Sequence, residues 1–234
     1  MAQKIHPISF RLGVVQVWNS TIQFYGKSFN QYYLILHKYL QIQNFLFRLF
    51  KKNNLLLDFQ ELKIKRNKIC LNIYYLYLPY VKNFDNYLFF GKISKIINQW
   101  YFLPNKIHFY LKSELKSTAN LIVIYAQYLL NKNMMHKKVL WNLCKLLQLQ
   151  LDIEKVCCFK SGLLKIKLKG YKIRLAGRLD GSKNQMAKSI EHTTGALPLT
   201  NIKNCVEYKN KELYTKSGVC GLQVWLFYEI KEFE

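Results

Sequence analysis

The pattern of hydrophobic and polar positions divides the chain into helical and strand-like stretches that follow an irregular start. Residues 1–30 are interrupted by Pro7 and two glycines and predict irregular structure. The apolar and aromatic stretch over 31–50 predicts a long helix that ends at the polar residues 51–54. The chain is therefore expected to start with an irregular segment followed by a helix.

Shorter elements follow this helix. Residues 62–65 and 69–74 alternate or are rich in β-prone types, which predicts two strands around a turn. Residues 84–101 predict a second helix that Pro104 closes, and 106–111 predict a third strand. The order helix, strand, strand, helix, strand is typical of a compact α+β RNA-binding module rather than of a Rossmann unit.

The pattern changes in the C-terminal half. Residues 113–149 predict a long helical region in two pieces. Lysines then alternate with Leu and Ile over 163–169, and the alternation resumes over 171–175 after Gly170, which predicts strands with a basic face. A last strand is predicted over 222–230.

These elements predict an α+β chain with two domains. We expect an N-terminal segment over 1–30, a first domain over 31–112 and a second over 113–234. With 234 residues, half of them hydrophobic, the chain has enough apolar material for real cores.

The charge of the chain is strongly positive. It contains 36 Lys and Arg against 13 Asp and Glu, a net charge of +23, and no carboxylate precedes Asp58. Such an excess predicts a polyanionic partner, first of all nucleic acid. A membrane surface is the rival polyanion, but no uncharged apolar run reaches the roughly 18 residues that span a bilayer, so no membrane insertion is expected.

The composition also bears on the origin of the chain. Lys outnumbers Arg 31 to 5, and Asn, Ile, Tyr and Phe are abundant, as in proteins from AT-rich genomes. Organelle genomes are often of this kind, although a nuclear or bacterial AT-rich genome stays open. No secretory signal or Arg- and Ser-rich transit peptide is evident, so an organellar protein with this sequence is expected to be made where it works.

Residues suited to catalysis or metal binding are thinly spread. The six cysteines form no C-x-x-C pair and have no His at zinc-ligand spacing, so buried reduced thiols are expected. The histidines form no H-E-x-x-H, and P-loop, G-x-S-x-G and G-x-G-x-x-G motifs are absent. We therefore predict no catalytic residue, no metal site, no cofactor and no enzymatic activity.

The helical pattern around residue 140 places cations beside an aromatic ring. At 100° per residue, Lys138, Trp141 and Lys145 share one side, while Met135, Val139, Leu143 and Leu146 share the other. Lysines that follow phosphates and an indole that stacks on a base suit single-stranded nucleic acid. A solvated lysine face with Trp141 in the core is the equally weighted alternative.

The stretch LAGRLDG over 175–181 resembles the LAGLIDADG motif of homing endonucleases. In that family the motif is a tightly packed helix that ends in a metal-binding acid. Here the segment is two residues short, Arg178 would put a charge in the packed seam, and the preceding alternation predicts a strand. A LAGLIDADG-like endonuclease or maturase is the alternative function, and it is the less favoured one.

Both ends of the chain are similar to one family, ribosomal protein S three, the third protein of the small ribosomal subunit, and most to its mitochondrial versions. The opening MAQKIHPISFRLG over 1–13 resembles the family's start. GYKIRLAGRLDG over 170–181 is similar to its strand ending in S-G-R-L-x-G, and GALPL over 195–199 to its G-x-x-P-L turn. TKSGVCGLQVWLF over 215–227 is similar to its T-x-x-G-x-x-G-x-x-V-W-x-F strand.

This resemblance implies a fold, partners and site residues. The fold would be a KH-like (type II) domain, whose G-x-x-G loop is degenerate because 81–94 contains only Gly91, followed by a C-terminal α/β sandwich domain. The protein would be a structural constituent of the small-subunit head in the mitochondrial matrix, beside ribosomal proteins S ten and S fourteen. It would bind rRNA and help to form the channel through which mRNA enters. The rRNA-binding residues would include Lys4, Arg11, Arg174, Arg178, Lys183 and Lys188, and the basic helix over 129–138 would turn Lys132, Lys137 and Lys138 toward mRNA.

Overall fold

The computed structural model describes residues 5–18, 29–65, 68–77, 86–100, 105–112, 118–159, 161–179, 186–216 and 218–231. The chain forms two compact units, one from Asn19–Glu114 and one from Met1–Trp18 together with Leu115–Glu234. The expectation that the first residues form a segment of their own is therefore wrong for 5–18, which belong to the C-terminal unit.

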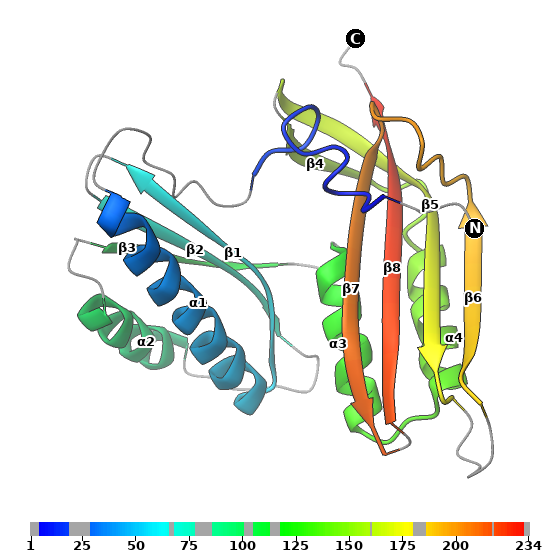
Figure 1. Cartoon of the computed structure of the whole chain (residues 1–234), viewed down its shortest axis with the longest axis horizontal. Helices are drawn as coiled ribbons and strands as arrows, with labels where there is room; N and C mark the ends of the chain where they lie inside the picture. Colours follow the sequence, from blue (N-terminus) through cyan, green and yellow to red (C-terminus); the bar gives the residue numbers. More distant parts are fainter. Residues whose placement is uncertain are drawn as a thin grey trace. The chain divides into compact units, whose positions relative to one another are not determined.

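The unit Asn19–Glu114 contains two helices and a sheet of three strands (Figure 1). Its elements are α1 (Phe29–Lys52), β1 (Leu55–Lys65), β2 (Lys68–Tyr77), α2 (Asn86–Trp100) and β3 (Asn105–Leu111). The central strand β2 pairs antiparallel with β1 and parallel with β3. The predicted order of elements is confirmed, and β1 starts seven residues before the predicted strand, at Leu55.

Helical periodicity explains how this unit builds its core. Residues Ile35, Tyr39, Ile42, Leu46 and Phe50 recur every three or four positions of α1 and are all buried. They pack with buried residues of α2 and with the alternating apolar positions of β1 and β2. One face of the sheet is thereby covered by α1 and α2.

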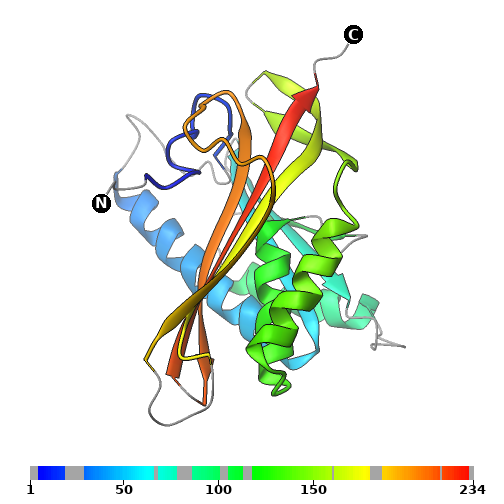
Figure 2. The same cartoon turned by 90° about the vertical axis from the view of Figure 1, so that its right-hand side faces the viewer.

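The C-terminal unit is a sheet of five strands with two helices on one face (Figure 2). Its elements are α3 (Ala119–Asn131), α4 (His136–Gln148), β4 (Glu154–Phe159), β5 (Gly162–Gly177), β6 (Lys188–Gly195), β7 (Cys205–Thr215) and β8 (Gly218–Lys231). The strands pair antiparallel in the order β4-β5-β8-β7, and β6 also pairs with β5. The predicted division of the helical region into two pieces is confirmed, whereas β4, β6 and β7 had no counterpart among the predicted elements.

The basic strands predicted around Gly170 form one continuous strand, β5. Ile166, Leu168, Ile173 and Leu175 are buried toward α3 and α4, and the lysines between them lie on the other face, as the alternation predicts. The pairing with β8 shifts register between Leu168 and Gly170, which is a β-bulge.

The bulge lies where two glycines bring backbones unusually close. A Cβ on Gly170 would lie 2.1 Å from the Ala196 carbonyl oxygen, and a Cβ on Gly195 would lie 2.1 Å from that of Lys169. Gly195 also has φ +75°, a conformation that favours glycine. The end of β6 can therefore approach β5 only if both positions lack a side chain.

We expect Gly195→Ala to destabilise the protein by about 3 kcal/mol, because its Cβ meets rigid backbone. Chemical denaturation followed by circular dichroism measures this loss. Gly91→Ala is the matched control: Gly91 lies inside α2 with nothing within 4 Å of the added Cβ, so alanine should stabilise the helix by up to about 1 kcal/mol. Equal stability of the Gly195 variant and the natural protein would contradict this account of the bulge.

Candidate nucleic-acid interface

Residues 5–18 lie on the face of the C-terminal sheet opposite α3 and α4 (Figure 1). The His6 ring packs edge-on against Tyr208 at 4.9 Å, and the Gln16 amide donates a hydrogen bond of 2.9 Å to the Val206 carbonyl. Tyr208 in turn packs against Trp225, 5.1 Å away. The segment thus covers aromatic residues that the sheet would otherwise expose.

Arg11 anchors this segment. Its side chain is fully buried and donates hydrogen bonds to four backbone carbonyls, those of Pro7 at 3.0 Å, Leu199 at 2.8 Å, Asn201 at 2.7 Å and Asn204 at 2.8 Å. Four of the five N–H groups of this guanidinium meet protein oxygens and the side chain has no exposed surface, so it cannot reach a phosphate. The assignment of Arg11 to rRNA binding is therefore corrected: Arg11 joins the two ends of the chain.

A second group of charged residues lies on the helix side of the sheet. The Lys155 ammonium is 2.5 Å from one oxygen of Glu207 and 3.9 Å from the centre of the Tyr228 ring. The other oxygen of Glu207 accepts a hydrogen bond of 3.1 Å from the Ala119 amide at the start of α3. An acid at this end of a helix is favoured by the helix dipole, so Glu207 ties β4, β7 and α3 together.

The protonation states of this group suit a structural role. Burial, the largest single effect, lowers the pKa of Lys155, but the Glu207 carboxylate together with Tyr228 and Cys157 outweighs it, so the pKa of Lys155 is raised. Burial also raises the pKa of Tyr228, and it raises the pKa of the Cys205 thiol to about 12. At neutral pH the thiol and phenol stay protonated, so the group contains neither a thiolate nucleophile nor a phenolate base.

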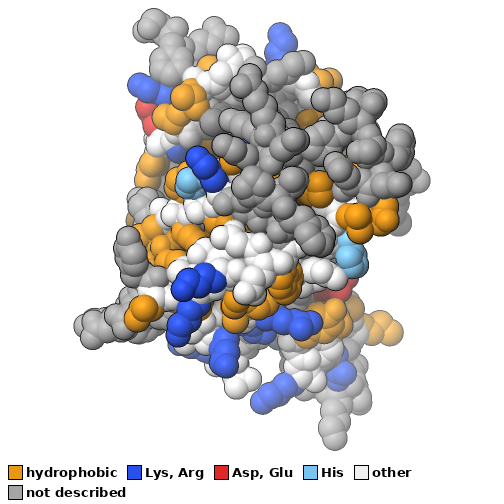
Figure 3. All heavy atoms as spheres, turned by 90° about the vertical axis from the view of Figure 1, so that its left-hand side faces the viewer, with side chains coloured by type: hydrophobic (Ala, Val, Ile, Leu, Met, Phe, Trp, Pro, Cys, Tyr) orange, Lys and Arg blue, Asp and Glu red, His pale blue; other side chains and the backbone are white. Residues whose placement is uncertain are grey.

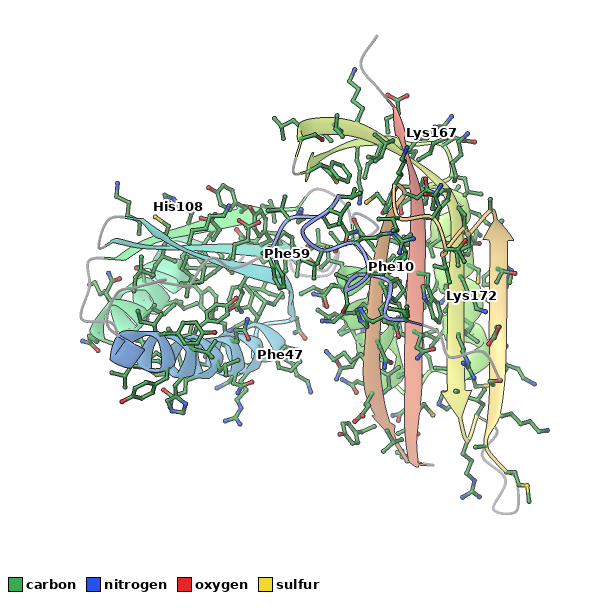
Figure 4. All side chains as sticks on the ribbon, turned by 45° about the horizontal axis from the view of Figure 1, so that its top comes forward. Phe10, Phe47, Phe59, His108, Lys167 and Lys172 are labelled. Carbon is green, nitrogen blue, oxygen red and sulfur yellow. The ribbon has the colours of Figure 1, made fainter. Side chains whose placement is uncertain are left out.

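The basic face of β5 carries fewer uncompensated charges than its sequence suggests. The Lys172 ammonium lies 2.7 Å from one oxygen of Glu191 on β6, and the Arg174 Nε lies 3.1 Å from the other. The Arg174 contact is an ion pair whose geometry is not that of a hydrogen bond. Asp152 lies 3.0 Å from Lys167 and 3.5 Å from Lys169. Figure 4 labels Lys167 near the start of β5 and Lys172 further along it. Carboxylates thus pair with cations on both halves of the strand.

The other residues predicted to bind rRNA lie in different settings. Arg178 directly follows β5 and is partly buried, and Lys188 begins β6 and is exposed. The register pairs Lys188 with Gly177, so the structure brings Arg178 and Lys188 to the same end of the β5–β6 pair. Lys4 and Lys183 lie outside the described residues.

The outer side of α4 is a cationic surface, and the stretch of sequence around it contains no carboxylates. Lys137, Lys138 and Lys145 are exposed along it, whereas Val139 and Leu143 face the core. No Asp or Glu occurs anywhere in 115–151. We call Lys137, Lys138, Trp141 and Lys145 the α4 face.

The structure decides between the two expectations for Trp141. Its side chain is 62% exposed, and the Lys145 ammonium lies 5.2 Å from the ring centroid, so Trp141 belongs to the α4 face and not to the core. Met135, predicted on the apolar side, is instead exposed at the N-cap of α4. Lys132 caps the preceding helix α3, and its ammonium lies 4.6 Å from the centre of the Tyr128 ring.

Neither metal chemistry nor a membrane helix is indicated in the described part of the chain. It contains no cluster of His, Cys, Asp and Glu able to hold a metal ion, and no helix long and apolar enough to cross a membrane. On the face drawn in Figure 3, Lys and Arg side chains are spread widely, with few carboxylates among the coloured residues.

Known proteins with similar sequences share one description. The family model for the C-terminal domain of ribosomal protein S3 matches residues 159–226. A small ribosomal subunit protein uS3m from Chondrus crispus is 47% identical over 234 residues, which cover 100% of this chain and 96% of the relative. Small ribosomal subunit proteins uS3 from Carsonella ruddii and Geobacter sulfurreducens are 30% and 28% identical, over 97% of this chain and 97% and 96% of their own length.

This chain belongs to the uS3 family of small ribosomal subunit proteins. The uS3m relative shows that it is of the mitochondrial type, a structural protein of the mitochondrial ribosome and not an enzyme. The endonuclease alternative has no support, and its helix is absent because Leu175, Ala176 and Gly177 end strand β5. The uS3 motifs instead mark sites of close packing, such as Gly177, where a Cβ would lie 2.7 Å from the Cys220 sulfur.

Sequence reasoning missed the residues that neutralise or bury charge in this uS3 protein. Glu191 and Glu207 lie in strands that had not been predicted, so their pairing with Lys172 and Lys155 had no visible basis. The signal that could have suggested these pairs is the regular alternation of lysines and apolar residues along β5, because a row of cations on one face favours acidic residues on a neighbouring strand.

We expect Arg11→Met to lower the free energy of unfolding by about 3 kcal/mol, because buried carbonyls would lose their charged donor. Thermal or urea unfolding of the purified chain measures this effect. Lys188→Met removes a charge from an exposed position and should change stability by less than about 0.5 kcal/mol. A stable Arg11 variant with weakened rRNA binding would restore the original assignment of Arg11.

Proposed function

We propose that this protein binds rRNA through the β5–β6 end of its C-terminal unit and guides mRNA into the small subunit along the α4 face. The observation that carries the proposal is the α4 face itself, a set of exposed lysines around an exposed indole in a stretch without carboxylates. Cations follow the phosphates of a single strand, and the indole offers a ring on which a base stacks. Lys132, Lys137 and Lys138 are the proposed mRNA contacts.

The proposed rRNA contacts are Arg174, Arg178 and Lys188, together with Lys4 and Lys183 outside the described residues. Lys188 is exposed at the start of β6 and lies near Arg178. Arg174 contributes less, since Glu191 already offsets its charge and that of Lys172. Ribosomal proteins S ten and S fourteen are the proposed neighbours in the head of the subunit.

We also propose that the unit Asn19–Glu114 is a KH-like domain of type II. Its element order, and a sheet in which β2 pairs antiparallel with β1 and parallel with β3, support this assignment. Gly91 lies in the interior of α2, so it is not part of a G-x-x-G loop. The domain is therefore expected to hold RNA by other residues than KH domains usually do.

Charge reversal on α4 tests the guidance of mRNA. In small subunits that contain Lys137→Glu and Lys138→Glu, we expect retention of mRNA to fall roughly tenfold, because two phosphate contacts become repulsive. Ultraviolet crosslinking to mRNA measures retention, and sedimentation shows whether the chain still enters the subunit. The control is Lys92→Glu with Lys95→Glu, two exposed lysines of α2. Unchanged mRNA crosslinking in assembled subunits would contradict the proposal.

Salt dependence tests the rRNA contacts. Each phosphate contact adds to the slope of binding affinity against salt concentration, so Lys188→Gln should reduce that slope by about 1. Arg174→Gln should reduce it less, because the ion pair with Glu191 already competes with phosphate. Filter binding of the purified chain to a small-subunit rRNA transcript measures both slopes. A larger change of slope for Arg174→Gln than for Lys188→Gln would contradict the proposal that Arg174 contributes less to rRNA binding than Lys188.

A further inference from the structure

The sheet of the unit Asn19–Glu114 has a second face, opposite α1 and α2. Along β2, Ile69, Leu71 and Ile73 are buried toward the helices. The residues that alternate with these three, such as Asn72 and Tyr74, therefore point to the opposite side. Their partners in β1 and β3 point to that side as well. We call this side of the sheet the open face.

Three aromatic rings form a row across the open face, one from each strand. Phe59 on β1 stacks on Tyr74 of β2 with 4.4 Å between centroids and 18° between planes. Tyr74 stacks on Tyr110 of β3 at 5.1 Å and 21°. Figure 4 labels Phe59 of β1 and His108 of β3. His108 lies two positions before Tyr110 on the same strand. The row is a single near-parallel stack of rings.

The row ends at Tyr110, on the edge strand β3. Tyr110 is 44% exposed, the largest exposure in the row. Among the described residues, the other ring near Tyr110 is that of His108, 6.2 Å away and tilted by 36°, so it does not continue the stack. A planar group from a ligand could therefore extend the stack at this end.

Lysines of strand β3 and of the residue after it lie near the row. The Lys112 ammonium lies 4.9 Å from the centre of the Tyr74 ring and 5.5 Å from that of Phe59. Lys106 and His108 are exposed on the same strand as Tyr110. The carboxylate of Glu61 on this face lies 2.9 Å from the ammonium of Lys63 and accepts from the Asn72 amide.

The charge of the whole unit favours an anionic ligand. Residues 19–114 contain 14 Lys and Arg against four Asp and Glu, a difference of +10. Stacked rings beside lysines, with the Glu61 carboxylate already paired, match the two needs of unpaired RNA, a surface for bases and charge for phosphates. An acidic protein would use the cations but not the ring stack.

We propose that the open face binds an unpaired segment of RNA, with one base stacked on Tyr110 and phosphates near Lys106 and Lys112. This inference rests on the proposed RNA-binding role of the protein and adds a site on its other unit. The stack of Phe59 and Tyr74 holds the Tyr110 ring in place, so that stacking a base costs little further ordering. The occupant is a single strand, because paired bases have no face free for Tyr110.

Mapping of crosslinks tests this site. Small subunits that contain the full-length protein are irradiated with ultraviolet light, and the crosslinked peptides are sequenced. We expect a nucleotide on the peptide that contains Tyr110. Crosslinks of this peptide to protein instead of RNA, or no crosslink in subunits that sediment normally, would overturn the site while leaving the proposed function intact. Failure of the protein to sediment with subunits would contradict the proposed function instead.

Substitutions give an independent measurement with the purified chain and a short single-stranded oligouridine. Tyr110→Leu should weaken binding about tenfold, because the base loses its stacking partner, whereas Tyr110→Phe should retain it. Tyr33→Leu is the matched control, since Tyr33 is 59% exposed on α1, away from the row. Equal affinities of the Tyr110→Leu and Tyr33→Leu variants would overturn the proposal.

A charge substitution guards against a folding defect in Tyr110→Leu. Lys106→Glu changes an exposed residue and leaves the ring stack complete, and it should weaken oligouridine binding severalfold. Duplex RNA of the same length should bind equally to the Tyr110→Leu variant and the natural chain. Loss of duplex and single-strand binding to the same extent would show that Tyr110 acts through general folding and would overturn the stacking role.

Discussion

The C-terminal unit depends on the way in which strand β5 pairs with three partners. β8 follows one edge of β5, while β4 and β6 share the other edge, β4 along its first part and β6 from Gly170 onward. Two strands can share an edge only if the second begins where the first ends. The close backbone approach at Gly170 and Gly195 makes this exchange possible, and it also fixes the start of the connection whose carbonyls surround Arg11.

The distribution of charge matters more than its sum. On the sheet, Asp152 and Glu191 neutralise lysines of β5, and inside the unit Glu207 neutralises Lys155. On the α4 face no carboxylate is close in the sequence, and its lysines are exposed to solvent, where they can meet a polyanion. Surfaces with the same basic residue types can therefore differ in how much of their charge is offset by carboxylates.

Periodicity predicted the elements whose polar and apolar sides are clean. The four helices among the described residues and the alternation of β5 were predicted in this way, and the same reasoning placed Trp141 beside Lys138 and Lys145. Strand β7 was missed because Glu207 points inward and breaks the alternation. Strand β6 was missed because it buries no residue fully and so has little apolar pattern.

Tertiary contacts account for the rest. The sequence near Arg11 does not show that carbonyls about 190 positions later accept hydrogen bonds from its guanidinium. Arg11 was therefore assigned to RNA, as a basic residue in a basic segment. The row on the open face was equally invisible, since Phe59, Tyr74 and Tyr110 come together only through strand pairing. Gly170 and Gly195 each begin a motif that resembles the family, but the steric need for glycine at these positions appears only when β5 and β6 lie side by side.

The burial of Arg11 has a consequence for how the chain is made. During translation its first residues leave the ribosome long before the carbonyls of Leu199, Asn201 and Asn204 exist. The unit Asn19–Glu114 is complete in the meantime and can fold by itself, since domains fold as units during synthesis. Docking of the N-terminal segment is thus a late step that requires the C-terminal unit to be synthesised. A product that ends before Leu199 would lack these acceptors, and its basic N-terminal segment would stay undocked.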